Sequence, residues 1–482
     1  MTPDSTSRIA IVGGGIAGLS AAHRLIELAP RTGVSVFEAS SRLGGVLSTV
    51  HQYGFQAERS ADNFITTVPW GVELCSRLGL LADLIQTNPE HRRTHVVRRG
   101  RLHRLPDGFL MMAPTRLWPL AFTPILSPLG KLRVAFEYII PPCKDDSDES
   151  MATFVRRRLG REAFDRLVEP LVSAVYAADM EKLSVLATLS RFRDMERQYG
   201  SLIRAMRQEM KHRPNVKDES GPRYSMFVTL RNGLTSLVEA IARRLPKTAV
   251  RLNARVQSIE QQENGWQVRL APSESPSQIG PLAIENVTFD AVILTTPSPE
   301  TARLLAPIDA GLTSELRRIE HSGTAVVSLG FEDRQIDHPL DGIGAVVPAI
   351  EKSPILACSF SSRKYPHRAP AGKTLLRAFV GGARQPELAE MADDQLLPLV
   401  LTHLRPLFGI HGKPVFCDIA HWPQTMPQYQ VGHKELVARI EGRTRQIPGL
   451  QLAGNAYHGV GLPDCIHGGE QAAERTLDSL AG

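Results

Sequence analysis

The sequence predicts an α/β protein that begins with a parallel-sheet unit and continues into one or two further domains. The first observation is an apolar strand, a glycine-rich turn, an amphipathic helix and a second strand, in that order, within residues 8–37. The second is an alternation of helix and strand patterns across residues 300–440. The third is a length of 482 residues with 42% hydrophobic and 22% charged residues, enough for two or three domains around a large core.

The opening unit has the pattern of a Rossmann-like, dinucleotide-binding strand and helix. The apolar run Ile9–Val12 leads into Gly13, Gly15 and Gly18, which match G-x-G-x-x-G. The first glycine allows a tight turn, the second lets backbone approach a pyrophosphate, and the third lets the helix pack closely on the strand. Free N–H groups at the start of that helix favour phosphate. Glu38 ends the second strand 20 residues after Gly18, where a carboxylate accepts the ribose hydroxyls of an adenosine.

Composition excludes several classes of protein. The formal net charge of +6 is modest for 482 residues, and we expect no nucleic-acid partner. The five cysteines are scattered without a C-x-x-C pair and no histidines show ligand spacing, so we expect reduced thiols in a cytosolic protein and no metal site. The first eight residues are polar and no run of about 18 apolar residues occurs, so we expect neither a secretory signal nor a membrane-spanning helix.

Two neighbouring segments after the first unit have unusual compositions. His91–Arg104 holds six arginines and three histidines without an acid, and Phe109–Pro142 is rich in aromatic residues, leucine and proline. Proline excludes one long helix, so we expect short helices joined by bends. Large apolar residues beside arginines suit a surface that touches anionic lipid head groups, which predicts peripheral membrane contact. A solvated basic strand pair and an ordinary buried cap are the alternatives.

Three segments resemble known flavoproteins. Arg42-Leu43-Gly44-Gly45 resembles the R-x-G-G segment of the FAD-containing amine-oxidase superfamily. Residues 149–184, ESMATFVRRRLGREAFDRLVEPLVSAVYAADMEKLS, resemble the signature of the protoporphyrinogen oxidase and coproporphyrinogen III oxidase family. Residues 454–465 are similar to the G-N-x-Y-x-G-V-G-x-P-D-C pattern of the same family, with Asn455 where many FAD enzymes have aspartate. The resemblance covers nearly the whole chain.

The resemblance implies a Rossmann-like FAD-binding domain built from discontinuous segments, an α+β substrate domain and a helical, membrane-facing domain. The expected boundaries are 1–90, 225–300 and 440–482 for the first, 301–439 for the second and 91–224 for the third. Surface loops are expected at 212–222 and 272–281. FAD is expected to bind without a covalent link. The expected cofactor-binding residues are Gly13, Gly14, Gly15, Ile16, Ala17, Gly18, Glu38, Ala39, Arg42, Gly44, Gly45, Val46, Ser60, Ala61, Asp62, Asn63, Val256, Ala453, Val460, Gly461 and Leu462.

In this family, three successive two-electron oxidations convert a porphyrinogen into a porphyrin in haem biosynthesis. The resemblance implies protoporphyrinogen IX as the substrate, hydride transfer to the flavin, and molecular oxygen as the acceptor that yields hydrogen peroxide. It places Val346 and Phe379 on the walls beside the macrocycle and Asn63 near the flavin edge. No general base or other catalytic residue is assigned.

Two departures from the family pattern leave the substrate open. Plant and animal members have an arginine for a propionate where this chain has Thr94, and a leucine wall where it has Ser359. Arg93 or Arg98 could supply the missing cation, although strand alternation could turn either side chain outward. Coproporphyrinogen III is therefore an alternative to protoporphyrinogen IX.

Rival interpretations concern the reaction and not the fold. An amine oxidase or a carotenoid desaturase on the same fold is one rival, and a flavin-binding module without enzymatic activity is another. Amine oxidases resemble the chain in its glycine segments but would not explain residues 149–184 or the Asn455 motif. Attachment to the cytoplasmic membrane is expected through residues near 109–138, and a homodimer is left open.

Overall fold

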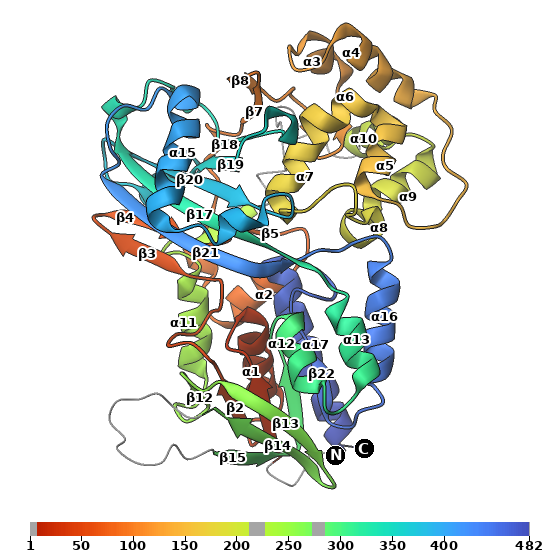
Figure 1. Cartoon of the computed structure of the whole chain (residues 1–482), viewed down its shortest axis with the longest axis vertical. Helices are drawn as coiled ribbons and strands as arrows, with labels where there is room; N and C mark the ends of the chain where they lie inside the picture. Colours follow the sequence, from red (N-terminus) through yellow and green to blue (C-terminus); the bar gives the residue numbers. More distant parts are fainter. Residues whose placement is uncertain (1–6, 212–226, 272–284, 482) are drawn as a thin grey trace.

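A computed structural model describes residues 7–211, 227–271 and 285–481 of the chain. The loops expected at 212–222 and 272–281 lie outside these residues. Within the described ranges, no helix is long and apolar enough to cross a membrane. Figure 1 shows a lower domain that contains both chain ends, an upper sheet, and a cluster of helices beside that sheet.

The lower domain is built on a five-stranded sheet whose strands come from distant parts of the chain. Its order is β12-β2-β1-β16-β22, and all neighbouring strands are parallel. The α/β class and the Rossmann-like assembly from discontinuous segments are thereby confirmed. The strands are β1 (Arg8–Val12), β2 (Gly33–Phe37), β12 (Val250–Arg251), β16 (Ala291–Leu294) and β22 (Leu450–Leu452).

Both faces of this sheet are buried, which explains the unbroken apolar run in β1. Ile9 and Ile11 pack against helices on one face, whereas Ala10 and Val12 pack into a second core on the other. The first face is covered by α1 (Ile16–Leu28), α11 (Thr235–Arg244) and α17 (Leu462–Ala481). The second is covered by β13 (Val256–Gln262), β14 (Gly265–Leu270), β15 (Asn286–Phe289), α12 (Ser298–Leu305), α13 (Ala310–Arg317) and α16 (His433–Thr444).

The upper domain is a seven-stranded sheet in the order β21-β17-β20-β19-β18-β7-β8. Only β18 and β7 pair in parallel within it. Its outer face packs on α15 (Asp393–Phe408). The strands are β7 (Thr94–Arg98), β8 (Arg101–Arg104), β17 (His321–Glu332), β18 (Gly344–Val346), β19 (Ile355–Phe360), β20 (Lys373–Gly381) and β21 (Phe416–Pro427).

Two of the expected domain boundaries need correction. β7 and β8 were expected within the helical domain (91–224), but they complete the upper sheet because β7 pairs with β18. α13 was expected within the substrate domain, but its Leu312 and Leu316 pack into the core of the lower domain. Pairing partners so far apart in the sequence leave no local pattern that reveals them.

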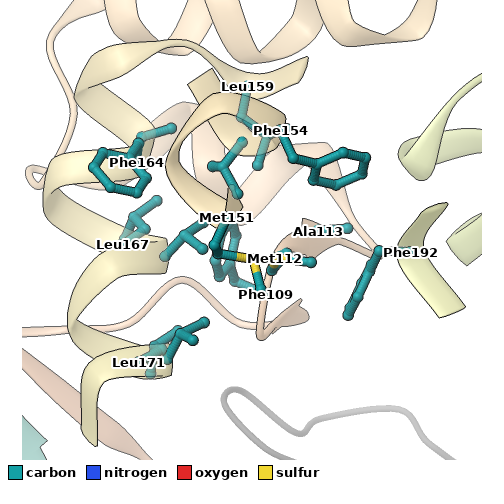
Figure 2. Packing of buried hydrophobic residues seen from close by; sticks show 14 of the residues in the cluster. Phe109, Met112, Ala113, Met151, Phe154, Leu159, Phe164, Leu167, Leu171 and Phe192 are labelled. Carbon is teal, nitrogen blue, oxygen red and sulfur yellow. The ribbon is translucent and has the colours of Figure 1, made fainter. Parts of the chain in front are cut away.

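The third region is a cluster of short helices around one apolar core. Figure 2 shows Phe109 and Met112 beside Met151 in this core, to which Phe154 and Phe164 also belong. The core also contains Val96, Val346 and Ala357, so these helices pack directly on the upper sheet. The helices are α3 (Leu117–Phe122), α4 (Pro128–Ala135), α5 (Met151–Leu159), α6 (Arg161–Ala163), α7 (Glu169–Tyr176), α8 (Val185–Thr188), α9 (Ser190–Tyr199) and α10 (Leu202–Lys211), with η2 (Phe136–Tyr138) and η3 (Phe164–Val168).

Smaller elements join these three regions. The hairpin of β3 (Thr49–Gln52) and β4 (Phe55–Glu58) is followed by α2 (Trp70–Arg77). A small sheet is formed by β5 (Phe64–Ile65), β11 (Phe227–Leu230) and β6 (Leu84–Gln86), and a short pair by β9 (Phe109–Leu110) and β10 (Ala113–Pro114). α14 (Ser361–Lys364) follows β19 directly.

Candidate active site

The glycine turn between β1 and α1 separates two roles for its glycines. A Cβ on Gly18 would lie 2.0 Å from the carbonyl oxygen of Gly13, so Gly18 is required by the turn itself. A Cβ on Gly15 would meet no atom within 4 Å, and the Gly15 backbone is extended (φ −72°, ψ 177°). Gly15 is the N-cap residue of α1, and no side chain caps the first N–H groups of this helix. The open space at the first turn of α1 therefore fits the pyrophosphate of a dinucleotide.

Glu38 and the segment after it lie against this turn. Glu38 accepts hydrogen bonds from the Gly14 N–H (2.7 Å) and the Ser40 N–H (2.8 Å). Each carboxylate oxygen keeps acceptor capacity for ribose hydroxyls. The Ala254 N–H donates to the Glu38 carbonyl (2.9 Å), which brings the segment leading to Val256 beside Glu38. These residues are therefore gathered at one side of the glycine turn.

The Arg42–Val46 segment covers the glycine turn. Gly44 forms an isolated bridge with Gly15, and its φ of +101° is a conformation that favours glycine. Arg42 donates to the carbonyls of Gly45 (2.6 Å) and Leu47 (3.1 Å). In this structure, Arg42 thus fixes the loop that encloses the expected cofactor site.

The C-terminal motif reaches the same end of the parallel sheet between β22 and α17. The Tyr429 hydroxyl donates to the Asn455 carbonyl (2.6 Å) and accepts from the Gly459 N–H (2.8 Å). The Asn455 side chain donates to the Thr425 carbonyl (3.1 Å). Asn455 and Tyr429 therefore tie this glycine-rich turn to the end of β21 and to the chain just after it. Val460 packs against the helical core. The expected cofactor residues Ala453, Gly461 and Leu462 flank this turn.

The segment Ser60–Asn63 connects the lower domain to the upper sheet through buried charges. The Lys364 ammonium lies 3.1 Å from one Asp62 oxygen, and the Arg377 guanidinium lies 3.3 Å from the other. Although burial favours the neutral acid, these two cations hold the pKa of Asp62 below its ordinary value. Asn63 donates to the Tyr365 hydroxyl (3.3 Å).

The residues that face Asp62 and Asn63 were not found from the sequence. Lys364, Tyr365 and Arg377 lie about 300 residues away from them, in α14, the loop after it and β20. The one available signal was Arg377 itself, a lone arginine inside the apolar run of β20. Arginine is almost never fully buried unless it is paired, so such a residue indicates a buried partner.

Buried polar atoms beside this cluster have no partner among the described residues. They are Arg377 Nε, Ser328 Oγ and Ser60 Oγ. Arg377 and Ser328 are paired in register on β20 and β17, and Arg377 donates to the Ser60 carbonyl. Buried polar groups are normally hydrogen-bonded. Three such groups together indicate a place where a polar ligand or water completes the structure.

Val346 and Phe379, two of the substrate residues expected from the sequence, lie on one side of the upper sheet, here called the inner face. Its register aligns Val96, Val346, Ala357 and Phe379 in one row across four strands. The neighbouring row contains Thr94, Gly344, Ser359 and Arg377. Arg377 lies over the Phe379 ring, 5.2 Å from its centre. The inner face therefore joins the expected wall residues to the buried charges at Asp62.

The two candidate arginines differ in the face they occupy. Arg98 lies two residues beyond Val96 on β7, and strand alternation places it on the inner face. Arg93 pairs with Asp341 at 3.7 Å and is 52% exposed at its side chain, on the side of His95. The structure thus brings Arg98, and not Arg93, to the face that carries Val346 and Phe379.

Asp341 also belongs to a group of possible metal ligands that the sequence did not predict. Ligand atoms of His95, His338 and Asp341 lie within 4.8 Å of one another. However, Arg104 and Arg93 already pair with the Asp341 carboxylate, and the Leu340 N–H donates to His338 Nδ1 (3.0 Å). Asp341 and His338, two of the three possible metal ligands, are therefore already engaged in contacts within the protein.

The parallel sheet, the open glycine turn and the converging C-terminal motif define a flavin-dependent oxidoreductase of the dinucleotide-binding type. The chain belongs to the family described as flavin containing amine oxidoreductase, whose model matches residues 16–477. Its cofactor is FAD. A cyclohexylamine oxidase from Brevibacterium oxydans IH-35A, at 16% identity and a TM-score of 0.68, shares the fold alone.

Three more similar proteins match over nearly the whole chain. Coproporphyrinogen III oxidase of Bacillus subtilis (strain 168) is 33% identical over 99% of each chain. Chloroplastic protoporphyrinogen oxidase of Nicotiana tabacum is 30% identical over 98% of this chain and 85% of its own. A crystal structure from Exiguobacterium sp. 255-15, described as a protoporphyrinogen oxidase, superposes with a TM-score of 0.86 at 30% identity and covers 99% of this chain and 100% of its own.

Proposed function

We propose that the protein oxidises a porphyrinogen to the corresponding porphyrin with non-covalently bound FAD, and that coproporphyrinogen III is its substrate. The observation that carries the proposal is full-length similarity, at 31–33% identity, to coproporphyrinogen III oxidases. The inner face supports it, because Phe379 stays partly exposed at the end of a row whose other apolar side chains are covered by the helical core, and an aromatic wall suits one side of a flat macrocycle.

The residues of the chain have separate tasks in this reaction. FAD supplies a two-electron acceptor for each of three oxidations, and oxygen is the final acceptor. Val346 and Phe379 hold the ring, and the helical core that packs on them excludes water. Asp62, Asn63 and their partners fix the chain between the cofactor cradle and the inner face.

Protoporphyrinogen IX is the second candidate because plant protoporphyrinogen oxidases are 30% identical to this chain. Thr94 and Ser359, the two departures from the family pattern, are polar residues in one row of the inner face, so this chain presents a different surface to the substituents of the ring from that of the plant members.

The test is aerobic turnover of coproporphyrinogen III and protoporphyrinogen IX, followed by porphyrin fluorescence, with a primary amine as the third substrate. We expect the largest kcat/KM for coproporphyrinogen III and no turnover of the amine. Turnover of the amine alone would replace the proposal with an amine oxidase.

We further propose that α3, α4 and η2 form an apolar tip that contacts a membrane surface. Among the residues that the structure describes, eight of the seventeen exposed large apolar side chains lie within residues 117–139. Trp118 and Phe122 are 75% and 78% exposed, and their rings stack at 5.9 Å. We expect flotation with vesicles that contain anionic lipid, and a Trp118→Ser/Phe122→Ser variant should lose it. If neither the unmodified protein nor the variant floats with the vesicles, the proposal is contradicted.

A further inference from the structure

Arg377 touches two parts of the site that come from different domains. It lies in the middle of β20, and its side chain is only 1% exposed. Its guanidinium carbon lies 5.2 Å from the centre of the Phe379 ring. The same guanidinium donates a hydrogen bond to the Ser60 carbonyl and lies 3.3 Å from an Asp62 carboxylate oxygen. Arg377 therefore contacts both the aromatic wall expected for the macrocycle and a segment expected to bind the flavin.

The segment that Arg377 holds begins at the cofactor cradle. Arg42 fixes the loop over the glycine turn, and burial followed by the nearby charge of Arg59 lowers the pKa of Arg42. The Arg59 N–H donates to the Ser48 carbonyl (2.8 Å), and the Arg59 carbonyl accepts from the Trp422 indole (2.6 Å) on β21. Residues 59–63 thus run from the cradle to the inner face of the upper sheet.

Other contacts fasten this segment independently of Arg377. The Lys364 ammonium lies 3.1 Å from the second Asp62 oxygen, and the Asn63 side chain donates to the Tyr365 hydroxyl (3.3 Å). Both contacts remain when Arg377 is replaced. We therefore expect a substitution of Arg377 to shift the segment against the sheet and not to release it.

Stability alone does not account for Arg377. Its Nε and Nη1 atoms form no hydrogen bond with the residues that the structure describes, although Nη1 lies near Asp62. The Oγ of Ser328, opposite Arg377 on β17, is also without a partner among them. Burying a charge costs free energy that an ion pair regains only when the remaining donors are also hydrogen-bonded. A partly satisfied arginine between two surfaces of the site therefore favours a role in the site.

We propose that Arg377 is a positioning residue that sets the macrocycle wall against the flavin-contact segment. The proposal rests on the proposed function and adds a residue to it. A guanidinium is planar and rigid, so it can contact the Phe379 ring while its N–H groups hold Ser60 and Asp62. Hydride transfer needs reacting atoms about 3–3.5 Å apart, and a misplacement of about 1 Å can lower the rate about a hundredfold. Arg377 thus fixes donor and acceptor surfaces as one unit.

The experiment compares Arg377→Lys and Arg377→Met with a control. Lysine keeps the positive charge but lacks the planar fork that reaches Ser60 and Asp62 together, whereas methionine lacks both. Arg158→Met is the control, because it removes an equally buried arginine from the helical region. Each FAD-loaded protein is mixed anaerobically with coproporphyrinogen III, and the rate constant of flavin reduction is measured. Fluorescence titration with coproporphyrin III gives the dissociation constant.

We expect slower flavin reduction with nearly unchanged binding. The rate constant should fall at least about tenfold in Arg377→Met and at least about threefold in Arg377→Lys, because both variants loosen the alignment. The dissociation constant of coproporphyrin III should stay within about threefold, since the wall itself is intact. Arg158→Met should reduce its flavin within about twofold of the unmodified rate, as expected for a distant site.

Flavin content and the thermal midpoint give the folded fraction of each variant, and Arg377→Lys carries the test if Arg377→Met does not fold. An unmodified rate in Arg377→Lys would assign the effect to charge and overturn the positioning role. Losses that follow porphyrin binding or the folded fraction would overturn it as well. These outcomes leave the proposed function standing, which fails only if porphyrinogens do not reduce the flavin of the unmodified protein.

Discussion

Buried charge in the helical region and buried charge on the inner face of the upper sheet are treated differently by the fold. Glu137 and Arg158 are both fully buried among the helices. Glu137 also accepts from the Ser201 hydroxyl (2.6 Å) and the Leu202 N–H (2.7 Å), so its carboxylate is surrounded by donors. On the inner face, Arg377 Nε and Ser328 Oγ have no partner among the described residues. The surrounded Glu137–Arg158 pair holds the helical region together, whereas the open polar atoms beside Asp62 leave room for a polar ligand or water.

The largest expected effect is loss of FAD binding at the glycine turn, where Gly15 borders open space and Gly18 is packed against the turn itself. Gly15→Val should abolish FAD binding, because its side chain would enter the open space that fits the pyrophosphate, while the apoprotein keeps its thermal midpoint. Gly18→Val should lose FAD and also lower the midpoint of the apoprotein, since its Cβ would collide with the Gly13 carbonyl. Flavin absorbance after gel filtration and differential scanning calorimetry measure the two properties. Full FAD binding by Gly15→Val would remove Gly15 from the cofactor site.

A substitution in the buried Glu137–Arg158 pair should lower the free energy of unfolding. Glu137→Gln removes the nearer of the two carboxylates that face the buried Arg158 and leaves only Glu196, 3.4 Å away. Breaking such a buried pair costs up to about 3–5 kcal/mol of unfolding free energy. Arg161→Gln is the matched control, since Arg161 is 85% exposed and its pair with Asp165 should contribute less than about 1 kcal/mol. Urea unfolding of both variants gives the comparison. Similar midpoints for the two would contradict a structural role for the buried pair.

A substitution on the inner face should lower catalytic activity and leave stability largely unchanged. Phe379→Ala should lower kcat/KM for the porphyrinogen at least about tenfold, because loss of a wall changes how the ring is held for transfer. The flavin spectrum, photoreduction of the flavin and most of the thermal stability should be retained. A variant that loses flavin, or whose activity only follows its folded fraction, would assign Phe379 to the core.

The smallest effect concerns pH. Burial lowers the pKa of His433 to about 4, and its ring stacks on Tyr429 at 3.9 Å. In the unfolded chain, a histidine takes up its proton near pH 6.5. Below that pH the unfolded state binds the extra proton, so this group lowers the unfolding free energy as pH falls from about 6.5 to 4, by at most roughly 3 kcal/mol.

His433→Gln should therefore show a flatter stability profile between these pH values. A further loss below pH 4.5 should remain in both proteins. Although burial opposes ionisation, hydrogen bonds from Arg157 and the Cys143 N–H lower the pKa of Glu196 to about 2, and the stability from that charged carboxylate is lost as pH falls toward 2. Identical slopes for both proteins from pH 6.5 to 4 would exclude His433 as the source.

The same contrast explains which features could be predicted from the sequence. The glycine turn and Glu38 follow local rules within one strand–helix–strand unit, and in the structure Glu38 accepts a hydrogen bond from the Gly14 N–H of that turn. Lys364 and Arg377 could not be assigned to Asp62, because their contact depends on how two domains meet. Strand alternation alone could not place Arg98, since the face of β7 is defined only by its pairing with β18. The apolar tip was visible in composition, but its exposure became clear only from the packing of the other helices.

The proposed function requires this flavoprotein to take electrons from a porphyrinogen. The most direct measurement is anaerobic mixing of the FAD-loaded protein with coproporphyrinogen III while flavin absorbance and porphyrin fluorescence are followed together. We expect the absorbance of oxidised flavin to decrease as porphyrin fluorescence appears, and admission of oxygen to restore the flavin. Flavin that stays oxidised in the presence of both porphyrinogens, but is reduced by an amine, would contradict the claim.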